Sequence, residues 1–140
     1  MNKKYKTIGL LLIIVLSTIL VSGCTGGSGE SETKLDVTEV SVAPAGYGMY
    51  NVKATLIPDK DYSYLGMVAI FYDKDGAVIG TSPLVWNMNN VKEGQTIKIN
   101  GNAFLSSSSE SPAKIEIGLF SSAFSGNDMS SALWTETIDL

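Results

Sequence analysis

The chain has 140 residues, with ten lysines, fourteen acidic side chains and no histidine, and its net charge is −4 at neutral pH. Without histidine it can form neither a Ser-His-Asp triad nor an imidazole base, and its one cysteine excludes a cysteine-rich zinc site. The acidic balance and the absence of arginine argue against nucleic-acid binding, because phosphates need basic partners.

The first 23 residues have the pattern of a secretory signal peptide. Residues 1–6 contain three lysines, and residues 7–21 contain no charged side chain. At roughly 1.5 Å per residue, a helix of that apolar length spans about 22 Å, which is short of the ~30 Å hydrocarbon core of a bilayer. We therefore predict a lipoprotein-type signal peptide over residues 1–23. The alternative is an uncleaved, slightly short membrane anchor.

The segment ends with small residues and a cysteine, Val21-Ser22-Gly23-Cys24. This tetrapeptide resembles the lipobox of secreted lipoproteins, and the resemblance implies cleavage before Cys24 and a lipid on its sulfur. One acyl chain binds membranes only marginally, so stable anchoring implies at least two chains on or near Cys24. Lipidation also explains a lone cysteine in a secreted protein. We expect the mature protein to be lipid-anchored at the extracytoplasmic face of the cell membrane.

Residues 24–34 are rich in glycine, serine and charge and contain no large apolar side chain, so they cannot build a core. We predict that they form a flexible tether with a random-coil reach of about 17 Å. From Cys24 onward, seven lysines oppose fourteen acidic side chains, which gives a net side-chain charge of −7. That charge argues against docking on an anionic bilayer.

Residues 35–140 suffice for one domain with its own core but not for two. Their apolar residues recur mainly with period two, in short runs separated by glycine, proline, asparagine and aspartate, which predicts β-strands. In chain order we expect seven strands, within residues 37–43, 50–57, 64–72, 76–81, 96–100, 113–120 and 132–140. The third run is apolar on both faces, as expected of a central strand that is covered on each side.

Seven strands at this spacing, with no amphipathic helix between them, predict an all-β fold. The expected architecture is an immunoglobulin-like antiparallel β-sandwich. Because no cysteine pair is available to link the sheets, we expect apolar packing of Phe71, Trp86, Trp134 and the isoleucines to hold them together.

The stretch AIFYDKDGAVIG, residues 69–80, places two aspartates and a glycine between apolar runs. An EF-hand calcium loop with Gly76 at its sixth position would have Phe71 and Ser82 at its first and twelfth positions, where oxygen ligands are required. The pattern instead predicts a hairpin in which Asp73 caps a type I turn and Gly76 adopts the left-handed conformation.

This stretch and its continuation, VAIFYDKDGAVIGTSPLVWNMNNVKEGQTIKI, resemble the FxLYD domain. Phe71-Tyr72-Asp73 matches the Leu-Tyr-Asp of the family, Gly76 follows in the turn, and NNVKEGQT is similar to a later turn of the family. Ala69 replaces the aromatic residue that names the family, and Glu93 replaces the usual proline. The resemblance covers roughly residues 48–120. It implies a small extracytoplasmic β-sandwich module of prokaryotic envelope proteins, and it implies no reaction.

We therefore expect a lipid-anchored surface module without enzymatic activity, cofactor or metal. Its role would be to bind or scaffold another envelope protein or an extracellular ligand. The alternative is a calcium-dependent or carboxylate-based surface hydrolase, with its acidic groups gathered at one end of the sandwich. The candidate acids are Asp59, Asp61, Asp73 and Asp75. Aspartate is also favoured in turns for purely local reasons.

A group of aromatic residues leaves a further alternative open. Tyr47, Tyr50, Tyr62, Tyr64 and Trp86 would form either an exposed aromatic binding face or part of the core and its edges.

Overall fold

The computed structural model describes residues 35–106, 111–123 and 128–140. The predicted signal peptide, the predicted tether and Cys24 lie outside the described residues. The described residues form seven strands and one short 3-10 helix. These are β1 (Asp36–Gly46), β2 (Met49–Ile57), β3 (Tyr62–Tyr72), β4 (Val78–Val91), β5 (Ile97–Phe104), β6 (Lys114–Phe120), η1 (Met129–Ser131) and β7 (Trp134–Asp139).

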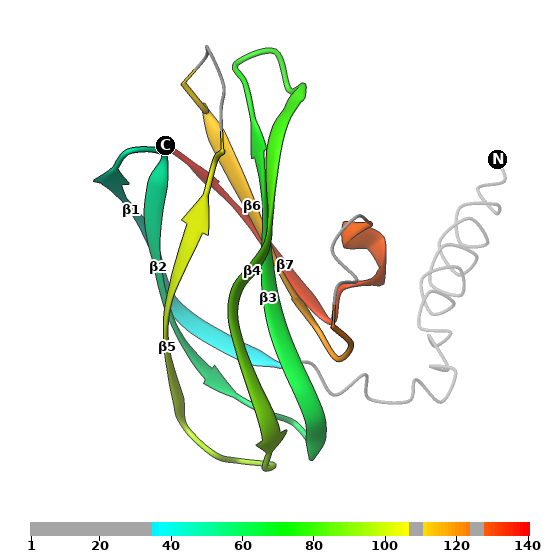
Figure 1. The fold of residues 1–140 in the computed structure, drawn as a ribbon. Coiled ribbons are helices and arrows are strands. Elements are labelled where there is room, and N and C mark those ends of the chain that lie inside the picture. Colours follow the sequence, from blue (N-terminus) through cyan, green and yellow to red (C-terminus); the bar gives the residue numbers. More distant parts are fainter. Residues whose placement is uncertain (1–34, 107–110, 124–127) are drawn as a thin grey trace, which may run out of the picture. The chain divides into compact units, whose positions relative to one another are not determined.

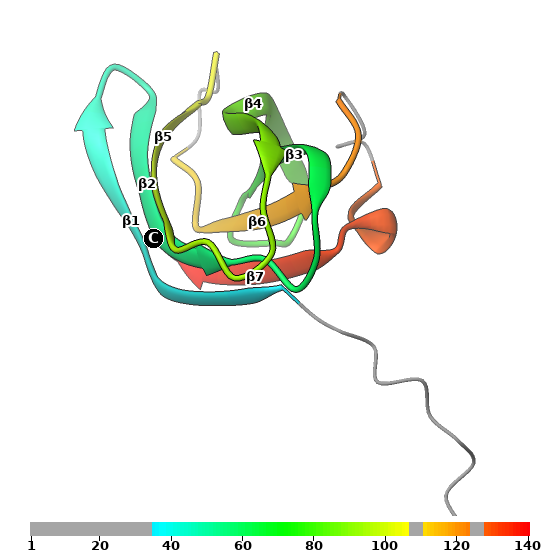
Figure 2. The ribbon, with the colours of Figure 1, turned by 90° about the horizontal axis from the view of Figure 1, so that it is seen from below.

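The strands form two antiparallel sheets that face each other (Figures 1 and 2). One sheet has three strands in the order β1-β2-β5, and the other has four in the order β4-β3-β6-β7. The predicted all-β, immunoglobulin-like antiparallel sandwich is therefore confirmed. None of the described residues belongs to a helix long and apolar enough to span a membrane.

The core lies between the sheets and is built by the period-two alternation of each strand. Its inner faces are lined by Val52, Ala54 and Leu56 of β2, Ile97 and Ile99 of β5, and Ile115, Ile117 and Leu119 of β6, all of them buried. β3 is buried on both faces along most of its length, as predicted for a central strand, and it lies between β4 and β6 in its sheet.

The aromatic part of the core differs in part from the sequence prediction. Phe71 is fully buried and packs across the sandwich on Tyr50 of β2, with ring centroids 5.2 Å apart and ring planes tilted by 50°. Trp86 and Trp134 are only partly buried. They belong to β4 and β7, the two edge strands of the four-stranded sheet, where a side chain can be covered on one side only.

β4 continues to Val91, ten residues beyond the end of the predicted strand at residue 81. Its register to β3 shifts between the pairs Ala69↔Ser82 and Met67↔Trp86, so β4 has a bulge that contains Pro83. Proline has no N–H to donate and is accommodated at an edge strand with a bulge. The sequence prediction therefore ended this strand too early, just before the bulge.

The connection between β6 and β7 packs on the outer face of the four-stranded sheet. Asp128 caps η1, because its carboxylate accepts a hydrogen bond of 2.9 Å from the N–H of Ser130. A β-carbon on Gly118 would lie 2.6 Å from the sulfur of Met129, which shows how closely this methionine covers β6.

The sandwich has two distinct ends. The start of β1 pairs with the end of β2 through Asp36 and Ile57, beside the loops at residues 58–61 and 92–96, at the lower end in Figure 1. The β3–β4 hairpin and the C-terminus lie at the upper end in Figure 1. The β1–β2 turn belongs to this upper end, because the end of β5 lies against it and the N–H of Leu105 donates a hydrogen bond of 2.8 Å to the carbonyl of Gly48.

Candidate binding surface

The four candidate aspartates do not gather at one end of the sandwich. Asp59 and Asp61 precede β3, whereas Asp73 and Asp75 follow it. The eleven residues of β3 separate the two pairs by roughly 35 Å at about 3.3 Å per residue. Within the ranges that the structure describes, no three acidic, histidine or cysteine side chains are placed to hold a metal ion. The four aspartates therefore do not form the single acidic cluster that the hydrolase alternative requires.

Asp73 and Asp75 belong to the β3–β4 hairpin, and the predicted turn is confirmed. The N–H of Gly76 donates to the carbonyl of Asp73 at 3.2 Å, and Gly76 has a φ of +83°. The Asp73 carboxylate accepts hydrogen bonds of 2.8 Å from the N–H groups of Asp75 and Ala77. This aspartate therefore stabilises a local turn.

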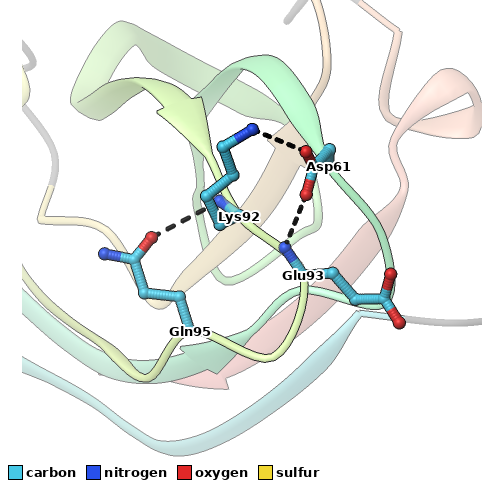
Figure 3. A network of polar contacts seen from close by, with 4 residues as sticks. All are labelled: Asp61, Lys92, Glu93 and Gln95. Carbon is cyan, nitrogen blue, oxygen red and sulfur yellow. Dashed lines mark hydrogen bonds and ion pairs between the residues drawn. The ribbon is translucent and has the colours of Figure 1, made fainter.

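Asp61 joins two loops at the other end (Figure 3). Its carboxylate lies 2.7 Å from the ammonium of Lys92 and accepts a 2.9 Å hydrogen bond from the N–H of Glu93. The hydrogen bonds from Lys92 and from Glu93 lower the pKa of Asp61. A proline at position 93, as in the FxLYD pattern, has no N–H to donate to Asp61.

The tyrosines do not form one aromatic face. Tyr50 contacts the core, and Tyr62 is buried, with its hydroxyl donating to Asp59 at 2.7 Å. Burial, followed by the hydrogen bond to Asp59, raises the pKa of Tyr62. Tyr64 lies against Gly66 on the other sheet, and only Tyr47 is almost fully exposed, at 98%. These aromatic residues therefore belong to the core and its edges, except for Tyr47, which is exposed.

The outer face of the three-stranded sheet carries a row of side chains along two neighbouring strands, all of them at least partly exposed except the buried Thr55. β2 and β5 are antiparallel, and directly opposed residues project from the same face. The residues alternate with those of the core and form four cross-strand pairs that we call the β2–β5 face. From the upper end downward, the pairs are Met49↔Phe104, Asn51↔Asn102, Lys53↔Asn100 and Thr55↔Lys98.

The upper end of the β2–β5 face is apolar. Met49 is 39% exposed and Phe104 49% exposed. The adjacent turn connects β1 to β2 through Tyr47 and Gly48, whose φ values of 53° and 74° are typical of a type I′ turn. Glycine is required at position 48, because a β-carbon there would lie 2.5 Å from the carbonyl oxygen of Leu105. Tyr47 is a large aromatic residue in a backbone conformation that favours asparagine, aspartate or glycine.

The lower end of the β2–β5 face is polar and adjoins a bulge in β1. The bulge lies between the pairs Thr38↔Thr55 and Ser41↔Lys53 and contains Glu39, whose φ is 54°. The Glu39 carboxylate accepts a hydrogen bond from the hydroxyl of Thr55 and lies 2.8 Å from the ammonium of Lys98.

An open depression of about 370 Å³ adjoins this cluster, between β1, β2 and β5. Its lining includes Ser41, Lys53 and Asn100 in addition to Glu39 and Lys98. The hydrogen bond from Lys98, followed by that from Thr55, lowers the pKa of Glu39. The carboxylate is therefore held in its charged form, and the polar end of the face has a defined shape.

Sequence reasoning did not identify the β2–β5 face. Its polar members look like the solvated positions of ordinary amphipathic strands, and the pairing of β2 with β5 cannot be read from either strand alone. One signal was present: Met49 and Phe104 are apolar at positions where the alternation predicts polar residues.

The fold defines the class of this protein as an immunoglobulin-like antiparallel β-sandwich. Comparison with known proteins gives no match to the chain, whether among models of protein families, curated proteins or solved structures.

Proposed function

We propose that this protein is a lipid-anchored β-sandwich module without catalytic activity, which binds or scaffolds another component at the extracytoplasmic face of the cell membrane. The lipobox-like tetrapeptide that ends at Cys24 supports the anchor. The resemblance to the FxLYD domain agrees with this compartment and with a role in the cell envelope.

The observation that carries the proposal is the position of the β1–β2 turn relative to the start of the domain. Leu35 directly precedes β1, which begins beside the loops at residues 58–61 and 92–96. Tyr47 lies at the opposite end of β1, after an eleven-residue strand of roughly 35 Å at about 3.3 Å per residue. A lipid on Cys24 would attach twelve residues before the first residue of β1, Asp36. The exposed Tyr47 and the apolar end of the β2–β5 face would then be presented away from the membrane.

The hydrolase alternative has lost the arrangement that would support it. Asp73 and Asp75 form a turn at one end of the sandwich. At the other end, Asp61 bonds to the loop at residues 92–96, and Asp59 accepts a hydrogen bond from the hydroxyl of Tyr62. We therefore propose no second function.

Metabolic labelling with a radioactive fatty acid tests the anchor. The wild-type chain should incorporate label and fractionate with membranes, whereas Cys24→Ser should lose the label. Equal labelling of both proteins would contradict the lipid anchor, irrespective of what the domain binds.

A second experiment tests the binding role. The full chain is used as bait in detergent-solubilised membranes, and the captured material is compared with that captured by Tyr47→Asn. Asparagine suits the left-handed turn position, so this variant removes the ring without disturbing the turn. The proposal expects specific capture that decreases in the variant. Identical capture by both baits would contradict a binding role for this end of the sandwich.

A further inference from the structure

We infer that the β2–β5 face and the adjacent β1–β2 turn bind an extended, neutral, hydroxyl-rich glycan chain, with Tyr47 of the turn and Phe104 of the face stacking on sugar rings and the asparagines of the face bonding to hydroxyl groups. This inference deepens the proposed binding role and rests on it. It goes beyond that role because it assigns the surface, the chemical class of the ligand and the residues that contact it.

The size of the face argues against a protein as the occupant. The four cross-strand pairs extend over about 20 Å along the strands, and the three strands extend over about 10 Å across, at ~3.3 Å per residue and ~4.8 Å between strands. The resulting flat footprint of about 200 Å² is small beside the ~800 Å² of accessible surface that each partner buries in a typical protein complex. A narrow chain that runs along the strands matches this shape.

The edges of the three-stranded sheet argue against a partner that adds a strand. β1 carries the bulge at Glu39 and a proline at position 44, and both interrupt a regular hydrogen-bonding edge. On the other side, β5 is approached by β4 of the opposite sheet, where the N–H of Phe104 donates to the hydroxyl of Ser82 at 3.1 Å. The available surface is therefore the face of the sheet and not an edge.

The polar groups on the face match hydroxyl groups. Asn51 and Asn102 are directly opposed and exposed, and Asn100 lies opposite Lys53 in the next pair on the same face. An amide side chain offers two donors and a carbonyl acceptor, so it can pair with hydroxyl groups, which both donate and accept. Ser41, opposite Lys53 on the β1 side, adds a further hydroxyl.

The exposed aromatic residues match the apolar side of a sugar ring. Tyr47 projects from the turn with 98% of its surface exposed, and Phe104 is 49% exposed at the end of β5. The C–H groups on one side of a pyranose ring form an apolar surface, and aromatic rings supply a rigid, amphipathic platform for such contacts. Exposed aromatic residues next to amide side chains therefore favour a ligand that is apolar on its faces and hydroxylated at its rim.

The charges favour a neutral chain. Lys98 is already paired with Glu39 at 2.8 Å. Among the described residues Lys53 forms no ion pair, so it is the one cation on the face that can donate to a ligand. Because the chain from Cys24 onward has a net charge of −7, a polyanionic glycan would be repelled by the rest of the molecule.

The experiment uses the full chain in micelles of a detergent without a sugar headgroup. Calorimetric titrations with cellohexaose, chitohexaose, xylohexaose and mannohexaose test neutral ligands, and a polygalacturonate oligomer tests an acidic one. Saturable binding of at least one neutral hexasaccharide is expected. Tyr47→Asn and Asn102→Ala should each weaken that binding by about tenfold or more, a difference of ~1.4 kcal/mol.

The matched control is Asn87→Ala, which removes an exposed asparagine from the outer face of the other sheet. Its affinity should equal that of the wild type, and all three variants should keep the wild-type melting temperature within a few degrees. No binding of any neutral hexasaccharide at millimolar concentration overturns the inference. So does binding of the acidic oligomer alone, or equal effects of Asn87→Ala and Asn102→Ala.

Failure of this inference can be told apart from failure of the proposed function. A labelled Cys24 together with capture that depends on Tyr47, but without glycan binding, would leave a surface module with a different ligand. Glycan binding without label on Cys24 would retain the assigned face and remove the lipid anchor.

Discussion

At the residue scale, Glu39 combines an unfavourable backbone with favourable side-chain contacts. Its φ of 54° lies in the left-handed region, while its carboxylate bonds to Thr55 and Lys98. Glycine at this position relieves the backbone strain and removes the contacts, whereas alanine removes the contacts and keeps the strain. In urea unfolding we expect the order of stability to be wild type, then Glu39→Gly, then Glu39→Ala. An alanine variant at least as stable as the glycine variant would contradict the strained bulge.

The lowered pKa of Glu39 adds a pH dependence to this comparison. A carboxyl group with a lowered pKa in the folded state stabilises the fold above its unfolded pKa, near 4.5, and this contribution is lost as the pH falls through the folded pKa. The stability difference between wild type and Glu39→Gly should therefore shrink below pH 4.5. The Lys98→Met background, which lacks the main hydrogen-bond partner, should show a smaller pH effect.

The contribution of Tyr72 to stability should have the opposite pH dependence, because it should be lost at alkaline pH. Its hydroxyl donates to Glu116 at 2.5 Å, and burial followed by this hydrogen bond raises its pKa from 10.0 to about 12. A raised pKa stabilises the fold below pH 10, and the contribution is lost as the pH rises from 10 to about 12. Tyr72→Phe should remove a late tyrosinate step from an ultraviolet absorbance titration. It should also flatten the loss of stability in that window, and an unchanged titration would contradict the assignment.

At the scale of elements, the β3–β4 hairpin depends on the conformation of one glycine. Gly76 has a φ of +83°, and a β-carbon there would meet no atom within 4 Å, so any penalty arises from the backbone. Gly76→Ala should lower the free energy of unfolding by about 1 kcal/mol, and Gly76→Val by more. Asp75→Asn is the control and should be nearly neutral, because asparagine also tolerates turn geometry. Urea unfolding measures all three, and a neutral Gly76→Val would contradict the turn.

The edge strand β7 carries a charged residue on its core-facing side. Glu136 lies opposite the buried Ile117, so it belongs to the inner face, yet it is exposed at the edge of the sheet. A charge in this position disfavours pairing of the edge with another strand. Glu136→Val should increase self-association in size-exclusion chromatography with light scattering. Thr137→Val, on the outer face of the same strand, should do so much less, and equal behaviour of the two variants would rule out a protective charge.

At the scale of the whole molecule, the two sheets are held together by apolar contacts across the sandwich. Phe71 is fully buried and contacts Tyr50 of the opposite sheet. Phe71→Ala should therefore lower the free energy of unfolding by about 3–5 kcal/mol, through lost burial and a residual cavity. Val78→Ala, at a position 59% exposed, should change it by about 0.5 kcal/mol or less. Chemical denaturation compares the two, and similar losses would contradict a core centred on Phe71.

Sequence alone determined the features that depend on neighbours in the chain. Period-two alternation located the strands, the doubly apolar run at residues 64–72 identified the central strand, and Asp73 with Gly76 specified the hairpin. These predictions hold because side-chain alternation and turn geometry are set within a few residues. The tether, the signal peptide and the lipid on Cys24 remain predictions of the same local kind.

Tertiary structure alone decided what depends on residues far apart in the sequence. It placed Asp61 and Asp73 at opposite ends of β3. It also placed Trp86 on β4, an edge strand that continues past Pro83. It also set Asn51 opposite Asn102, which creates the β2–β5 face. Each outcome follows from strand register and sheet order. These are fixed by packing of the whole core, because a shift of one residue would turn every buried side chain of a strand towards solvent.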